Sequence, residues 1–126
     1  DGRRVVLLVE DEDAIRELAR MLLERHGYTV LQAADGEAAL EVAAAHPGRI
    51  DLLLSDVIMP RLGGRALAER LQAVRPDVRL LFMSGYTADT VLRQGIVDGG
   101  LAFVQKPFQG RHLLATVKAV LAAPSS

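Results

Sequence analysis

The chain has 126 residues, which fits one domain, and its 50% hydrophobic and 25% charged residues are typical of a folded globular protein. The net charge of −1 excludes the basic excess that drives non-specific binding to nucleic acid. The absence of cysteine excludes disulfide frameworks, thiolate catalysis and zinc ribbons.

Five short apolar runs follow one another, at residues 5–9, 28–31, 50–54, 78–83 and 101–104. Their starts lie 22 to 28 residues apart, which accommodates a strand, a helix and two turns. Three runs are almost wholly Val, Leu and Ile, which is typical of strands covered on both faces. The alternation predicts an α/β fold, a five-stranded parallel sheet between two helical layers. We expect the flavodoxin-like strand order 2-1-3-4-5, which is one of two common windings.

The first two segments between these runs predict helices with recognisable ends. Asp13 is expected to cap the first helix, and Gly27 stands where a left-handed residue ends it. The apolar face of this helix comprises Ile15, Leu18, Leu22 and Leu23. Asp35 is expected to cap a second helix over residues 37–45.

Three further helices are predicted in the second half of the chain. Pro76 ends the third helix, whose apolar residues are Leu67, Leu71 and Val74. The helix over residues 87–96 has the weakest pattern, because it contains modest or poor helix formers. The last helix has one clear apolar face, made of Leu113, Leu114, Val117, Val120 and Leu121.

Polar side chains stand at the carboxyl ends of four predicted strands, where sheets of this class bind their ligands. Glu10 and Asp11 follow the first strand, and Asp56 follows the third. Ser84 ends the fourth strand, and Lys106 follows the fifth. Because the first and third strands flank the point where the strand order reverses, we expect the three carboxylates to converge.

Three carboxylates that lie close together repel one another unless a proton or a cation sits among them. Oxygen ligands that leave coordination positions open suit Mg²⁺, which keeps waters and accepts phosphate oxygens. A carboxylate beside Mg²⁺ and a lysine is equipped to attack a phosphoryl group and form an acyl phosphate. We therefore expect Lys106 to neutralise phosphoryl oxygens and Ser84 to donate to another. Pro107 can set a cis peptide bond after Lys106.

Four segments together resemble the receiver domain of response regulators in two-component signalling. They are residues 7–11 (LLVED), 54–60 (LSDVIMP), 82–85 (FMSG) and 103–108 (FVQKPF), and they occur in the right order and spacing over the full chain. The resemblance implies the five-stranded α/β sandwich predicted above. It also implies one receiver domain over residues 1–123, with residues 124–126 as a tail or a linker stub.

The resemblance also implies roles for the site residues. Asp56 would be the phosphoacceptor, and Glu10 and Asp11 would be the acidic pair that holds Mg²⁺ with Asp56. The backbone carbonyl of Ile58 would be a further metal ligand. Glu10 replaces the aspartate that is commoner in the family, and its extra methylene is expected to make its metal contact water-mediated.

The family's switch residues are matched less completely. Ser84 would be the switch hydroxyl, and Lys106 would contact the phosphate. Phe103 stands at the switch aromatic position, which is often Tyr, so a switch that depends on a tyrosine hydroxyl is absent here. Ile58 and Tyr86 would flank the approach of water to the phosphorylated site, and neither orients water well, so slow dephosphorylation is expected.

Residues 83–87 and 100–108 look like receiver domains fused to the C-terminus of hybrid sensor histidine kinases. That context would explain the missing initiator Met and the absence of an output domain after residue 123. The phosphodonor would be a histidine kinase or a histidine phosphotransfer protein. An output partner, or a second copy of the chain, would bind the last two helices and the fifth strand.

We further expect no turnover of a free substrate, no direct binding of nucleic acid and no membrane contact. The longest apolar runs have about five residues, far fewer than a membrane helix needs, so a cytoplasmic protein is expected. His26, His46 and His112 are interpreted as surface residues without a catalytic role.

Other interpretations stay open. The acidic run at residues 10–13 could be a solvated helix start, and the chain could be a receiver-like interaction scaffold that accepts no phosphate. A phosphatase of the haloacid dehalogenase type is less favoured, because Val57 and Ile58 follow Asp56 where that family has a second aspartate two residues on. A nucleotide-binding flavodoxin-like protein is disfavoured, because no glycine-rich loop follows the first strand.

Overall fold

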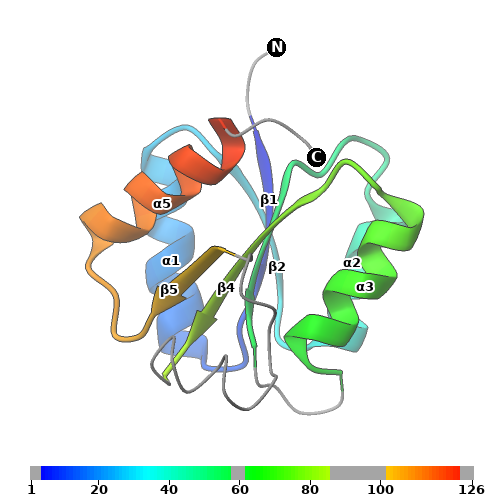
Figure 1. Cartoon of the computed structure of the whole chain (residues 1–126), viewed down its shortest axis with the longest axis horizontal. Coiled ribbons are helices and arrows are strands. Elements are labelled where there is room, and N and C mark those ends of the chain that lie inside the picture. Colours follow the sequence, from blue (N-terminus) through cyan, green and yellow to red (C-terminus); the bar gives the residue numbers. More distant parts are fainter. Residues whose placement is uncertain (1–3, 58–61, 86–101, 123–126) are drawn as a thin grey trace.

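A computed structural model describes residues 4–57, 62–85 and 102–122. The elements in chain order are β1 (Val5–Val9), α1 (Asp13–Arg25), β2 (Thr29–Ala33), α2 (Gly36–Ala45), β3 (Leu52–Asp56), α3 (Gly64–Val74), β4 (Arg79–Ser84), β5 (Ala102–Gln105) and α5 (Gly110–Ala122). The strands form one parallel sheet in the order β2-β1-β3-β4-β5 (Figure 1). This is the predicted fold and strand order.

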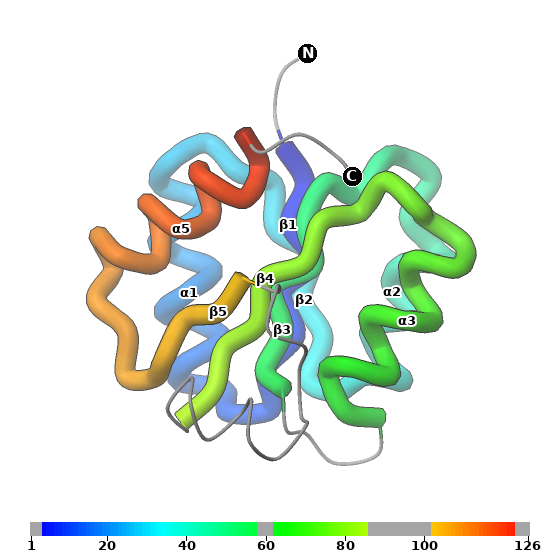
Figure 2. Tube along the Cα trace, viewed as in Figure 1, coloured from blue at the N-terminus to red at the C-terminus, as the bar shows by residue number. Residues whose placement is uncertain are grey.

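The sheet lies between two layers of helices. In Figures 1 and 2, α1 and α5 cover one face, and α2 and α3 cover the other. Because side chains alternate along a strand, Leu7 and Val9 of β1 pack toward α2 and α3. Val6 and Leu8 pack toward α1 and α5. Burial of one leucine side chain stabilises the fold by about 1.5–3 kcal/mol. Leucines are buried on both faces of the sheet, so packing against both helical layers holds the sheet in place.

The predicted helix ends are confirmed at two positions and wrong at one. Gly27 follows α1 with a φ of 91°, the left-handed conformation that glycine adopts without strain. The Asp35 side chain accepts a hydrogen bond from the backbone N–H of Ala38, at 2.8 Å, and caps α2. Asp13 does not cap α1: Glu12 occupies the cap position, and Asp13 is the first helical residue. Any acidic residue in a consecutive run can begin a helix, so the sequence alone did not separate the two.

The predicted apolar faces need correction in two places. Leu18 is 51% exposed, because Ala19 and Leu23 occupy the face of α1 that packs on the sheet. Val74 marks the end of α3 as predicted but is 73% exposed. The apolar face of α5 is confirmed, with Leu113, Val117 and Leu121 buried. The helix predicted over residues 87–96 lies outside the described residues.

The helices that the structure describes are all too short, or too polar, to span a lipid bilayer.

Candidate functional site

The topology brings the predicted site residues at the strand ends to one edge of the sheet. Val9, the last residue of β1, pairs with Ser55 of β3, so Glu10 and Asp56 follow side by side. Asp56 in turn pairs with Met83 of β4. Parallel strands end at the same edge, which is why residues far apart in the sequence meet there.

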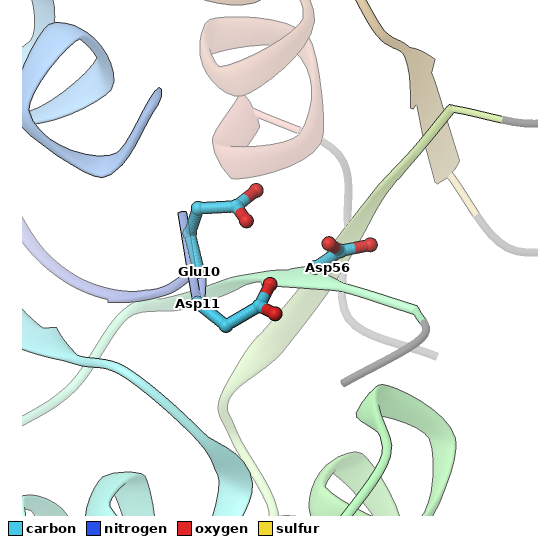
Figure 3. Close-up of side chains that lie close together, drawn as sticks. All are labelled: Glu10, Asp11 and Asp56. Atoms are coloured by element: carbon cyan, nitrogen blue, oxygen red, sulfur yellow. The ribbon is translucent and has the colours of Figure 1, made fainter. Parts of the chain in front are cut away.

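Three carboxylates gather at this edge. Glu10, Asp11 and Asp56 each place one oxygen within 4.8 Å of the others, and Figure 3 shows the three groups around one shared space. Glu10 is 0% exposed and Asp56 is 7% exposed, whereas Asp11 is open to solvent. The cluster therefore has two buried carboxylates and one that faces water, an arrangement open to a ligand arriving from solution.

Lys106 joins the carboxylates. Its Nζ donates to Oδ2 of Asp56 at 2.9 Å and forms an ion pair with Oε1 of Glu10. Oε1 of Glu12 lies 3.9 Å from the same nitrogen. The backbone N–H of Lys106 donates to the carbonyl of Ser84 at 2.7 Å, and the Lys106–Pro107 peptide bond is cis, as predicted. The end of β5 is thus tied both to the cluster and to the end of β4.

Burial and pairing act on the proton affinities of this group. Burial raises the pKa of Glu10. The contact with Lys106 acts to lower this pKa, and the nearby charge of Asp56 acts to raise it, so the net effect is an increase. For Lys106, burial acts to lower the pKa. The contacts with Glu10 and Asp56 outweigh it, so the pKa of Lys106 is raised. Lys106 is therefore a cation throughout the neutral range.

The donor set fits Mg²⁺. It consists of carboxylate oxygens, the hard ligands that this ion prefers, and the exposed side of Asp11 leaves room for water or phosphate oxygens. The three carboxylates and Lys106 carry a net charge of −2 when all are ionised, which a divalent cation balances. Both carboxylate oxygens of Glu10 already have partners: Oε1 pairs with Lys106, and Oε2 accepts a hydrogen bond from the backbone N–H of Glu12.

The remaining predicted residues are placed as follows. Ser84 ends β4 and is buried. Phe103 lies on β5 opposite Phe82 and packs, half-buried, against the core between the sheet and α2 and α3. Ile58 and Tyr86 lie outside the described residues. The roles assigned to all of these residues stay predictions.

The histidines lie just beyond helix ends and on α5. His26 follows α1 and His112 lies on α5, and both are exposed as expected. His46 follows α2 and is half-buried, with its Nε2 shielded from solvent. The expectation of a surface position therefore holds only in part for His46.

Sequence reasoning missed Arg16 beside the site and did not foresee how closely Gly64 approaches Asp56. Arg16 of α1 donates to the backbone carbonyl of Glu10 at 2.7 Å. Gly64, the first residue of α3, lies so close to Asp56 that an added Cβ would stand 2.4 Å from the Asp56 carbonyl oxygen. A glycine pair at a helix start could have signalled the second contact. No pattern signals the first, because it depends on the path of the connection between β1 and α1.

Comparisons with known proteins agree with the fold. The sequence model of the response regulator receiver domain matches residues 6–118. The sensor kinase CckA of Brucella abortus is 42% identical over 120 residues, which are 95% of this chain and 13% of that protein. The response regulator MprA of Mycobacterium ulcerans is 36% identical over 92% of this chain and 49% of its own length.

A solved structure shows the same likeness. The crystal structure of the receiver domain from the hybrid histidine kinase CckA superposes with a TM-score of 0.78 at 41% identity, covering 93% of this chain and 98% of that one. The chain thus spans most of that receiver domain, but about half or less of the two full-length relatives. The sequence match, the strand order and the acidic cluster agree, and the chain belongs to the response regulator receiver domain family of two-component systems.

Proposed function

We propose that Asp56 accepts a phosphoryl group from a phosphohistidine, at a Mg²⁺ site that includes Glu10 and Asp11. The observation that carries this proposal is the position of the Asp56 carboxylate. It lies inside a cluster of three carboxylates, and the Lys106 ammonium is 2.9 Å from its Oδ2. The acceptor oxygen of Asp56, the carboxylates that would hold Mg²⁺ and the ammonium group of Lys106 are therefore close enough to act on the same phosphoryl group.

The transfer is an in-line displacement at phosphorus. A carboxylate oxygen of Asp56 forms the new P–O bond while the P–N bond to the donor imidazole breaks, and the imidazole nitrogen leaves with the electron pair. When bound, Mg²⁺ would neutralise negative charge on the phosphoryl oxygens. Lys106 exchanges its bond to Asp56 for a bond to a phosphoryl oxygen, and the Ser84 hydroxyl donates to another. Few groups are needed, because positioning and charge supply most of the acceleration.

The phosphorylated state would be transmitted through β4 and β5. Ser84 and Lys106 are joined by a backbone hydrogen bond, so a shift at one strand end moves the other. Phe103 lies on β5, the strand that leads directly into Lys106. The surface of β5 and α5 would then change its affinity for an output partner or for a second copy of the chain.

The likeness to the CckA proteins supports a hybrid histidine kinase as the parent protein and a histidine kinase or histidine phosphotransfer protein as the donor. In this proposal residues 1–123 are the receiver domain and residues 124–126 its tail or linker stub. In the same proposal the domain turns over no free substrate and works in the cytoplasm.

Acetyl phosphate tests the acceptor directly. The chain is incubated with acetyl phosphate and Mg²⁺, and intact-mass spectrometry is expected to show the addition of one phosphoryl group. Asp56→Asn should abolish the adduct, whereas Asp77→Asn, at an exposed position, should keep it. An adduct that persists in Asp56→Asn, or none in the wild type, would overturn the assignment.

Beryllofluoride and a phosphomonoester separate the proposal from its alternatives. Amide NMR shifts at Ser84 and Lys106 on addition of Mg²⁺ and beryllofluoride are expected for a phosphoacceptor and not for an inert scaffold. Steady turnover of p-nitrophenyl phosphate would instead indicate a phosphatase.

A further inference from the structure

Arg16 holds the backbone of the acidic pair from the first turns of α1. Its Nη1 donates to the carbonyl oxygen of Glu10 at 2.7 Å, and its Nη2 donates to Oδ1 of Asp13 at 2.6 Å. The side chain is 19% exposed, so the guanidinium is largely shielded from water. Its backbone N–H also donates to the carbonyl of Glu12 at 2.9 Å, as the first turn of the helix forms.

Asp11 sits between two fixed peptide groups. The peptide before it carries the Glu10 carbonyl that Arg16 binds. The peptide after it carries the Glu12 N–H, which donates to Oε2 of Glu10 at 3.0 Å. Fixing the peptide planes on both sides of a residue fixes its φ and ψ, and these set the direction of its Cα–Cβ bond.

The carboxylate of Asp11 has little else to orient it. It is exposed, and within residues 4–57, 62–85 and 102–122 it accepts no hydrogen bond and forms no ion pair. It nevertheless lies within 4.8 Å of the carboxylate oxygens of Glu10 and Asp56. Among the described residues, the backbone that fixes its Cα–Cβ bond is therefore what directs it toward the cluster.

We propose that Arg16 is a positioning residue for the metal site, which acts by fixing the backbone on the N-terminal side of Asp11. The proposal rests on the Mg²⁺ site of the proposed function. Ligands that are held in place before the ion arrives bind it more tightly, because less conformational freedom is lost on binding.

The sign of the effect distinguishes positioning from simple charge. Arg16 is positive and close to a cation site, so its charge alone weakens Mg²⁺ binding. Removing that charge would tighten binding if electrostatics were its main contribution. Positioning predicts the opposite, weaker binding after Arg16→Gln.

A Mg²⁺ titration followed by amide NMR shifts tests this. Arg16→Gln is expected to weaken Mg²⁺ binding about tenfold, the low end of the range for a lost outer-shell partner. Arg16→Lys keeps the charge but has one nitrogen in place of the two that bind the Glu10 carbonyl and Asp13, so it should lie between this variant and the wild type. Arg20→Gln is the matched control, because Arg20 lies on the same helix and pairs only with Glu17 and Glu24 among the described residues. It should leave the affinity unchanged or slightly tighter.

Hydrogen exchange without metal gives a second readout. The Glu12 amide should exchange several-fold faster in Arg16→Gln than in the wild type or in Arg20→Gln, because the loop that orients its acceptor is loosened. If Arg16→Gln does not fold, Arg16→Lys carries both measurements, with weaker binding still expected.

Unchanged or tighter Mg²⁺ binding in a folded Arg16 variant would overturn the positioning role and leave the proposed function intact. Equal weakening in Arg20→Gln would overturn it as well. A wild-type chain whose amides do not respond to Mg²⁺ would instead overturn the metal site itself, and the role of Arg16 with it.

Discussion

The ammonium of Lys106 lies 2.9 Å from Oδ2 of Asp56, although the two residues are 50 positions apart in the chain. Their strands are not neighbours in the sheet, because β4 lies between β3 and β5. The lysine therefore crosses the end of β4, where its backbone N–H binds the Ser84 carbonyl. One residue thus fixes the ends of three strands and offsets the charge of the carboxylates.

Lys106→Met should destabilise the metal-free protein. The variant leaves Glu10 and Asp56 buried without their cation, and breaking such a pair lowers the free energy of unfolding by about 3 kcal/mol. Saturating Mg²⁺ should restore part of the loss, because it supplies the missing positive charge. Urea denaturation with and without Mg²⁺ measures both effects.

Lys118→Met is the control for that experiment. Lys118 is the other lysine of the chain, and it is exposed on α5. Its substitution should change the free energy of unfolding by no more than about 0.5 kcal/mol. A metal-free Lys106→Met protein as stable as the wild type would contradict the charge-balancing role.

The raised pKa of Glu10 predicts a dependence of stability on pH. In the unfolded chain a glutamate has a pKa of about 4.3, and burial raises the value in the folded state. Between the two values the folded state binds more protons, so this group makes the metal-free protein less stable as the pH rises. Glu10→Gln removes that contribution, so its stability relative to the wild type should rise as the pH increases above about 4.3.

Urea denaturation in EDTA at several pH values measures this difference. Glu41→Gln, at an exposed position on α2, is the control for the loss of a carboxylate elsewhere on the chain. A difference between Glu10→Gln and the wild type that does not vary with pH would show that the burial of Glu10 is fully compensated.

Much of the site could be predicted because the rules of parallel sheets are strict. Once five apolar runs are read as strands in the order 2-1-3-4-5, Glu10, Asp11 and Asp56 must meet at one edge. The same rules place Ser84 and Lys106 at that edge, and the resemblance to receiver domains supplied their roles. Strand order and strand direction decide which strand ends lie next to one another. A small error in the predicted end of a strand therefore does not change which residues meet.

Contacts that depend on one side chain's length or on the path of a short connection could not be predicted. The ion pair of Glu10 with Lys106 needs the reach of a glutamate. The bond from Arg16 to the Glu10 carbonyl depends on how the chain turns from β1 into α1. Leu18 faces solvent because a helix rotation of one residue puts Ala19 on the sheet instead. Sequence periodicity does not resolve a rotation of that size.

Gly64→Ala should disturb Asp56 through the backbone. An added Cβ would lie 2.4 Å from the Asp56 carbonyl oxygen and 3.0 Å from the Val57 Cα, so α3 or the end of β3 must shift. Overpacking of this kind destabilises a fold by about 1–3 kcal/mol. The rate of phosphorylation by acetyl phosphate should fall in the same variant, because the displaced backbone carries the acceptor.

Gly85→Ala controls for the change in backbone entropy. A Cβ at this position meets nothing within 4 Å in the described part of the chain. The free energy of unfolding should therefore change by about 0.5 kcal/mol or less. If Gly64→Ala and Gly85→Ala unfold at the same urea concentration, the close approach to Asp56 has no energetic consequence.

Asp51 immediately precedes β3 and Asp56 ends it, and substitutions of the two should separate stability from function. Both are 7% exposed, but Asp51 accepts a hydrogen bond from the backbone N–H of Val5 at 2.8 Å and pairs with Arg49 at 3.0 Å. Asp51→Ala removes both contacts and leaves the amide without its partner, so we expect a loss of about 2 kcal/mol in the free energy of unfolding.

The phosphoryl adduct should nevertheless form on Asp51→Ala at a temperature where the variant is folded, because the reacting groups lie at the far end of the strand. Asp56→Asn should lose the adduct while remaining folded. Intact-mass spectrometry and urea denaturation on the same samples measure the two effects together. A folded Asp51→Ala protein that no longer accepts phosphate would mean that the two ends of β3 are coupled, and that the site is not set by the strand ends alone.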